Sequence, residues 1–98
     1  MTIDGFEWDK NKNASNVEKH GVSFEEAAKA FLDPERILRF NRKHSNKESR
    51  FFCFGKVGYR VMTVRFTMRG QKIRIIGAGY WREGRKVYEQ DKKLRQRS

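Results

Sequence analysis

The sequence predicts an α+β fold, with a mostly antiparallel sheet of four or five strands, two N-terminal helices on one face and a C-terminal helical segment. Apolar residues recur at helical spacing before residue 34 and form strand-like runs after residue 35. Short polar links that contain glycine separate these runs, as tight antiparallel hairpins require. A chain of 98 residues suits one domain with one core, which we expect to span residues 1–98.

The first twenty residues predict a short strand followed by a helix. Phe6 and Trp8 alternate with acidic residues, as is typical of a strand. Asp9 can cap a helix over residues 10–20, and Gly21 can end it. This helix is rich in asparagine, which competes for backbone hydrogen bonds, so we expect tertiary contacts to stabilise it.

A second helix is predicted after a sharp corner that carries Lys19 and His20. Ser23 can act as the N-cap, and Glu26 can complete a capping box with it. Pro34 ends the helical segment. The apolar face of this helix holds four residues at helical spacing: Phe24, Ala27, Ala28 and Phe31.

Four strands are then predicted, over residues 36–42, 50–55, 59–68 and 72–79. Residues 82–98 contain helix formers with a sparse apolar stripe. Beyond Tyr88 this segment is so polar that a frayed or disordered basic tail over about residues 90–98 is an alternative to a docked helix.

The charge balance favours nucleic acid as a partner. The chain has 23 Lys and Arg against 12 Asp and Glu, which gives a formal net charge of +11. A surface this positive attracts polyanions. The alternative is a cationic surface that serves only solubility.

Several other classes of protein have little support. Cys53 is the only cysteine and lies in an apolar run, so we expect a buried, inert thiol. His20 and His44 do not have metal-ligand spacing, so we expect no metal or other cofactor. The polar start of the chain and the lack of a long apolar run predict a cytoplasmic protein without membrane contact.

Three arginines interrupt the apolar strands: Arg50, Arg65 and Arg74. An arginine in so apolar a strand must reach water or an anion. Strand parity places Arg50 on one face with Phe52, and Glu48 joins them if the strand begins earlier. Such arginines together on an uncovered face would bind phosphate. The alternative is that each extends to solvent or pairs with Glu48.

The chain also resembles a known family. The stretches FEWDKNK, NVEKHGVSFEEAAKAFLDP, HSNKESRFF, TMRGQKIRIIGA and VYE follow one another as they do in BrnT toxins of type II toxin–antitoxin systems. The resemblance runs from about Phe6 to Glu89. It implies a RelE-like fold and a ribonuclease that arrests translation. It also implies a BrnA-like antitoxin, which neutralises the toxin and forms with it a DNA-binding complex that represses their operon.

One departure from the family bears on the site. Gly77-Ala78-Gly79 stands where the family usually reads Ser-Ala-Arg. If that arginine belongs to the site in relatives, Arg82 or Arg85 would have to substitute for it here.

The expected reaction is metal-independent cleavage of RNA, in which the ribose 2′-OH attacks the adjacent phosphorus. Arg50 and Arg74 would hold the phosphate and stabilise its charge. Glu48 or His44 would accept the proton of the 2′-OH. The leaving oxygen would be protonated by one of two further candidates, His20 or Tyr80. Five cations are candidates for binding the RNA: Lys19, Arg65, Arg69, Arg82 and Arg85.

A non-catalytic module that binds RNA or an acidic protein is the alternative function. It requires only charge and stacking aromatic side chains, not an acid–base pair. In either case we expect an acidic, partly apolar segment of the antitoxin to cover the same arginines that RNA needs.

Overall fold

The computed structural model describes residues 5–44 and 47–97, and these residues form three α-helices and one mixed sheet of five strands. The strands are β1 (Phe6–Trp8), β2 (Ile37–Phe40), β3 (Arg50–Val57), β4 (Arg60–Arg69) and β5 (Lys72–Gly79). The helices are α1 (Lys10–His20), α2 (Phe24–Ala28) and α3 (Arg82–Arg97), with 3₁₀ turns η1 (Lys29–Leu32) and η2 (Arg42–His44). The predicted α+β class is therefore confirmed.

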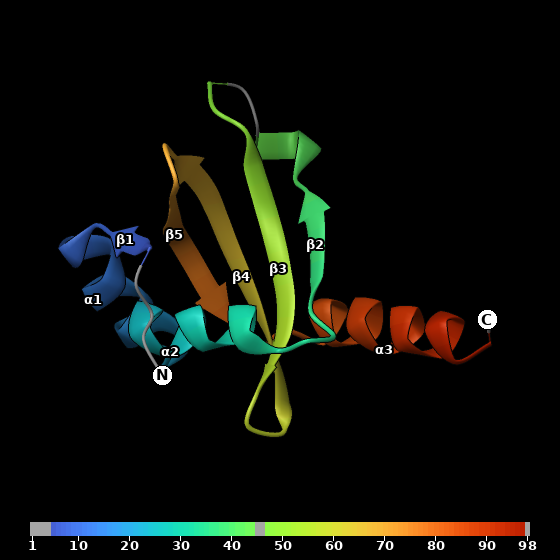
Figure 1. The fold of residues 1–98 in the computed structure, drawn as a ribbon. Coiled ribbons are helices and arrows are strands. Elements are labelled where there is room, and N and C mark those ends of the chain that lie inside the picture. Colours follow the sequence, from blue (N-terminus) through green and yellow to red (C-terminus); the bar gives the residue numbers. More distant parts are fainter. Residues whose placement is uncertain (1–4, 45–46, 98) are drawn as a thin grey trace.

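The sheet has the strand order β1-β5-β4-β3-β2 (Figure 1). The four strands β2 to β5 pair antiparallel, whereas β1 joins β5 in parallel. Two-residue turns that begin at Gly58 and Gly70 connect β3 to β4 and β4 to β5. Both glycines have φ near +60° to +70°, a backbone conformation that other residues rarely adopt.

Helix α1 has the predicted caps and the predicted dependence on tertiary contacts. The Asp9 carboxylate accepts a hydrogen bond from the amide of Asn11 (2.7 Å), and Gly21 ends the helix with φ 68°. Asn16 is buried, and its side-chain amide donates to the carbonyls of Val22 (2.8 Å) and Ala78 (3.0 Å). A residue that weakens the isolated helix therefore fastens it to β5.

The predicted N-cap of α2 is confirmed, because the Ser23 hydroxyl accepts a hydrogen bond from the amide of Glu26 (3.0 Å), but the return bond of a capping box, from the Ser23 amide to the Glu26 carboxylate, does not occur among the described residues. The Glu26 carboxylate accepts a hydrogen bond from the Tyr80 hydroxyl (2.9 Å). After one and a half turns the helix tightens into η1, whose backbone packs directly on β3. A side chain at Gly55 would overlap the carbonyl oxygen of Ala30, so only glycine permits this approach.

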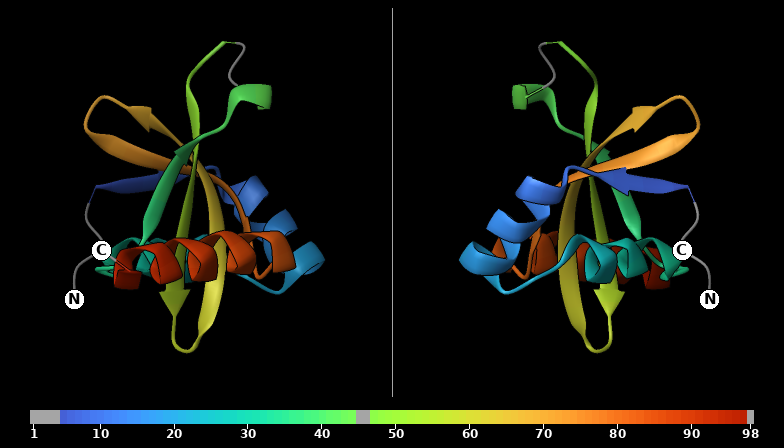
Figure 2. Two further views of the ribbon diagram at one scale, coloured as in Figure 1. Left: turned by 90° about the vertical axis from the view of Figure 1, so that its right-hand side faces the viewer. Right: turned by 90° about the vertical axis from the view of Figure 1, so that its left-hand side faces the viewer.

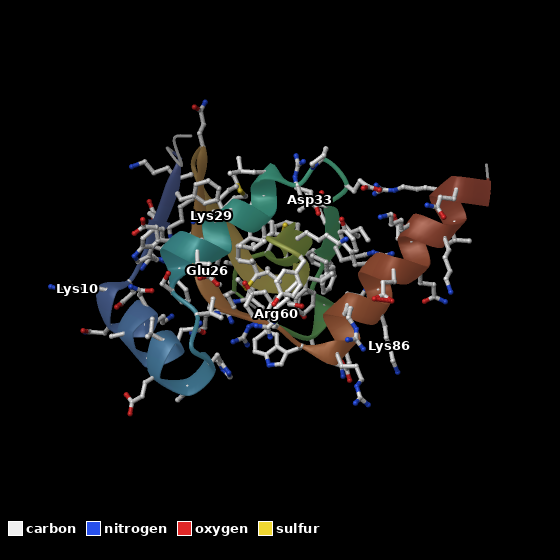
Figure 3. All side chains as sticks on the ribbon, turned by 90° about the horizontal axis from the view of Figure 1, so that it is seen from below. Lys10, Glu26, Lys29, Asp33, Arg60 and Lys86 are labelled. Carbon is white, nitrogen blue, oxygen red and sulfur yellow. The ribbon has the colours of Figure 1, made fainter. Side chains whose placement is uncertain are left out.

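The helices lie on both faces of the sheet. Figure 3, which views the molecule from below, shows α1 and α2 on one side of the strands and α3 on the other. Cys53 packs in the cluster under α2, and its neighbour Phe54 packs with Tyr88 of α3. This division follows from the pleat, because successive side chains of a strand point to opposite faces. Burial raises the pKa of the Cys53 thiol to about 12, in keeping with an inert thiol.

Helix α3 continues through the polar segment after Tyr88 to Arg97. The Tyr88 hydroxyl donates a hydrogen bond of 2.6 Å to Asp33, which follows η1. Beyond Tyr88, Asp91 pairs with Arg95 one turn later (2.9 Å). Like the other helices of the described chain, α3 is too short and too polar to span a bilayer.

Candidate functional site

One face of the sheet carries arginines on two of its strands at the same level. In the register of the sheet, Arg50 of β3 lies opposite Thr67 of β4, and Thr67 lies opposite Arg74 of β5. Directly opposed residues point to the same face, so the two arginines project side by side with one strand between them. Their Cα atoms are about 10 Å apart at the usual strand spacing. We call this surface, which also carries Arg65, the arginine face.

The end of the sheet that bears these residues rises clear of the helices. Figure 2 shows α2 and α3 at the lower end of the strands, while the start of β3 and the β4–β5 hairpin extend above them. Arg50 begins β3, and Arg74 follows the β4–β5 hairpin closely. The arginine face is therefore open at this end.

Each of the two arginines pairs with a carboxylate. Nη1 of Arg74 lies 2.8 Å from Oε2 of Glu7, and these side chains are only 25% and 30% exposed. Nη2 of Arg50 lies 3.8 Å from Oε1 of Glu48. Because a guanidinium has five N–H donors, a carboxylate can hold it in place while it binds a second anion.

Glu7 also belongs to this candidate site, although it is not among the residues predicted from the sequence. Phe6 and Trp8 point to one face of β1, so the sequence itself indicates that Glu7 points to the other face. Its pairing with Arg74 depends on the parallel register of β1 with β5, which brings together residues 67 positions apart.

The side chains of Arg65 and Trp81 lie close against β5 because two glycines leave room for them. Arg65 is opposite Gly77, and a side chain at that position would collide with its guanidinium. A Cβ at Gly79 would lie 2.7 Å from the Trp81 ring. The Arg65 guanidinium carbon lies 6.0 Å from the centre of that ring. Gly77 and Gly79 thus leave space for a cation and an indole from elsewhere in the chain.

A β-bulge keeps these groups on one face. The register shifts between Arg65 and Phe66, so Ile76 has no counterpart on β4. As a result Arg74 and Gly77, three positions apart, point to the same side. Bulges often occur beside functional sites because they redirect side chains in this way.

A cleft of about 680 Å³ opens between the arginine face and the first turns of α3. We call it the α3 cleft. Its lining includes Phe52, Phe54, Thr63, Arg65, Trp81 and Arg82. The Thr63 hydroxyl oxygen is buried and has no hydrogen-bond partner among the described residues.

The two predicted proton donors lie elsewhere. Tyr80 follows β5 six residues after Arg74, roughly 20 Å away along an extended strand. Its hydroxyl donates to Glu26, and the Arg60 guanidinium stacks on its ring at 3.8 Å; Figure 3 labels both partners. Burial and the hydrogen bond to Glu26 raise the pKa of Tyr80 to about 12. His20 is also at this end, with its ring edge-on to Trp81 at 5.2 Å.

The remaining predicted residues lie on several different elements. Lys19 is exposed at the end of α1, and Arg69 is exposed beside the β4–β5 turn. Arg82 lines the α3 cleft, and Arg85 forms an exposed ion pair with Glu89 (3.7 Å). The side chain of the predicted base His44 lies outside the described residues. No group of three His, Cys, Asp or Glu that could hold a metal ion occurs in residues 5–44 and 47–97.

Comparison with protein-family models matches residues 8–84 to a family described as the ribonuclease toxin BrnT of type II toxin–antitoxin systems. A search of curated proteins found no match. The matched segment spans most of the chain and includes Arg50, Arg65 and Arg74. The match confirms the resemblance noted from the sequence and implies an RNA target and an antitoxin partner. The chain therefore belongs to the BrnT family of ribonuclease toxins.

Proposed function

We propose that this protein is a metal-independent endoribonuclease whose RNA substrate lies across the arginine face. One observation carries the proposal: Arg50 and Arg74 share an open face on either side of Thr67. Two guanidinium groups at this spacing can converge on one phosphate. They supply positive charge where negative charge develops in the transition state, an effect of about 3–4 kcal/mol for each well-placed donor.

In the proposed reaction the 2′-oxygen of a ribose forms a bond to the adjacent phosphorus, and the bond from phosphorus to the 5′-oxygen breaks. Glu48, beside Arg50, accepts the proton of the 2′-OH. His44 remains the alternative base. Because Tyr80 and His20 lie at the far end of β5, we assign stabilisation of the leaving oxygen to Arg65. That oxygen takes its proton from solvent, and the products are a 2′,3′-cyclic phosphate and a 5′-OH.

The mechanism is tested by replacing the 2′-OH at the cut position with hydrogen. We expect cleavage to stop, because the nucleophile has been removed. Continued cleavage of the deoxy substrate would refute the mechanism.

The role of the arginine face is tested with Arg50→Ala and Arg74→Ala. We expect each to lower kcat by about 10²–10³-fold while the circular dichroism spectrum stays that of the folded protein. Lys10→Ala removes the same charge from α1, on the other side of the sheet (Figure 3), and should leave kcat unchanged. Equal losses in all three variants would show that total charge matters and that the face does not.

Glu48→Gln separates the enzyme from a binding module. An enzyme with Glu48 as base loses growth arrest in a bacterial host, whereas a module that acts by binding keeps it. If growth arrest persists in the double variant with His44→Gln, the binding function is favoured.

The proposal extends to the fold family and the partner. A RelE-like arrangement, with the sheet face opposite α1 and α2 left for RNA, agrees with the position of the arginine face. We propose that one toxin domain acts in the cytoplasm and is neutralised by a BrnA-like antitoxin whose DNA-binding part lets the complex repress its operon. The net charge of +11 supports an acidic antitoxin segment that covers the arginine face.

A further inference from the structure

We infer that the α3 cleft is a nucleobase subsite, which holds one unpaired base of the RNA beside the phosphate bound by Arg50 and Arg74. The inference rests on the proposed ribonuclease function and adds the chemical group that the protein recognises. An enzyme that contacted only phosphates would cut without regard to the bases. A base subsite makes cleavage depend on the nucleotide that fills it.

The walls of the cleft suit a flat aromatic ligand. Phe52 and Phe54 stack on each other, with ring centres 5.6 Å apart and planes inclined by 24°. Trp81 presents a third ring to the same cleft. Proteins hold unpaired RNA bases by stacking them on aromatic side chains and on arginine guanidinium planes. Arg65 and Arg82 also line the cleft and supply charge for the attached phosphates.

The orientation of Trp81 is set by its surroundings. Gly79 lets the indole lie close against β5, and His20 packs edge-on against it with an interplanar angle of 83°. A ring held in this way loses little conformational freedom when a base stacks on it. The cleft is thus preorganised to bind an aromatic ring.

The position and polarity of the cleft also fit a nucleotide. Thr67 lies between Arg50 and Arg74 in the sheet, and Arg65 is two residues away from Thr67 along β4. The backbone of Arg65 is therefore about 7 Å, measured along the strand, from the row that holds Arg50 and Arg74. This separation is within reach of a base whose phosphate lies between the two arginines. Gly84 of α3 packs against the Thr63 hydroxyl oxygen, so the polar groups that the cleft offers to a nucleotide are the guanidinium groups of Arg65 and Arg82.

Binding can be measured directly, because the chain has two tryptophans. Each gives one indole N–H signal in a ¹⁵N–¹H spectrum. Trp8 packs against Phe24 on the opposite face of the sheet and serves as an internal reference. We expect nucleoside 5′-monophosphates to shift the Trp81 signal saturably and leave that of Trp8 in place. Ribose 5-phosphate, which has the phosphate but no base, should require at least tenfold higher concentration for the same shift.

Two outcomes of this titration would overturn the inference. Equal shifts with ribose 5-phosphate would mean that the cleft binds phosphate and no base. No saturable shift with any of the four nucleotides would mean that it binds neither. The titration does not depend on cleavage, so nucleotide binding without RNA cleavage would sustain the subsite and contradict the proposed function.

Cleavage provides the second test. In a short RNA, each base near the cut is removed in turn to leave an abasic ribose. We expect one position at which base removal lowers kcat/KM by about tenfold or more, in line with one lost stacking contact. Trp81→Ala should abolish this sensitivity, whereas Trp81→Phe should largely retain it.

Tyr59→Ala is the matched control, because Tyr59 is an aromatic residue that is 90% exposed at the tip of the β3–β4 turn. It should leave the abasic profile, by which we mean the change in kcat/KM on removal of each base in turn, the same as in the parent protein. If Trp81→Ala keeps the full abasic profile, the base lies elsewhere and the inference is wrong. If Trp81→Ala weakens only antitoxin binding and not RNA cleavage, the cleft serves the antitoxin, and the inference is again wrong.

Discussion

The hydrogen bond between Tyr88 and Asp33 holds α3, one wall of the cleft, against the rest of the protein, and Tyr88→Phe removes it. Tyr88 is only 2% exposed, and its hydroxyl lies 2.6 Å from Oδ2 of Asp33. Hydrogen bonds to charged groups contribute about 1.5–3 kcal/mol. Asp33 is partly exposed and keeps two backbone donors, the amides of Lys56 and Glu35 at 2.8 Å, so we expect the lower end. A loss of about 1.5 kcal/mol lowers Tm by roughly 6–12 °C in a domain of this size.

The assay is thermal and urea unfolding, with Tyr59→Phe as the control. This variant loses the same hydroxyl at an exposed position and should unfold like the parent protein. If the two variants have the same Tm, the hydroxyl of Tyr88 contributes nothing and the argument about α3 fails.

The pH dependence adds an independent check on the same bond. Burial acts to raise the pKa of Asp33, but hydrogen bonds from the Lys56 amide, the Tyr88 hydroxyl and the Glu35 amide outweigh it and lower the pKa below its usual 3.8. A lowered carboxyl pKa stabilises the folded state above pH 4, and this stability is lost as the pH falls through the lowered value. The difference between parent and Tyr88→Phe should therefore be full at pH 7 and shrink below pH 4. A constant difference from pH 7 to pH 3 would contradict this account.

Three further predictions concern the site and its partner. Glu7→Gln should lower kcat by about tenfold, because Arg74 is then held less firmly. The free energy of unfolding in urea should fall by less than about 1 kcal/mol, because the Glu7–Arg74 pair is partly exposed. An unchanged kcat would show that Glu7 does not position Arg74. Gly84→Ala should destabilise the protein despite better helix propensity, because the new methyl group collides with the Thr63 hydroxyl. In a Thr63→Ala background, Gly84→Ala should lower the free energy of unfolding in urea by less. An equal loss in both backgrounds would show that no such collision occurs. In a salt series with the antitoxin, association should slow steeply while dissociation changes little, since apolar burial is not screened; an equally steep rise in dissociation would mean that charge alone holds the complex.

Local features of the sequence determined the elements and their ends. The caps at Asp9 and Ser23, the glycine at position 21 and the hairpin glycines were all readable, because each depends on residues within one turn of the chain. Strand parity likewise placed Arg50 with Phe52, since the alternation of faces is a property of the single strand. The charge balance, which needs no structure, pointed to a polyanion.

Contacts between distant segments decided how those elements form a site. The parallel pairing of β1 with β5 gives Arg74 its partner Glu7, and the bulge at Ile76 keeps Arg74 and Gly77 on one face. Neither the pairing nor the bulge could be predicted from the sequence, because the register between strands depends on how whole faces of the sheet pack and not on any local pattern. Side-chain chemistry alone predicted that Tyr80 acts at the same site as Arg74. Tyr80 comes six positions after Arg74, just beyond the end of β5, and because the chain between them is extended the two side chains are too far apart to share a site.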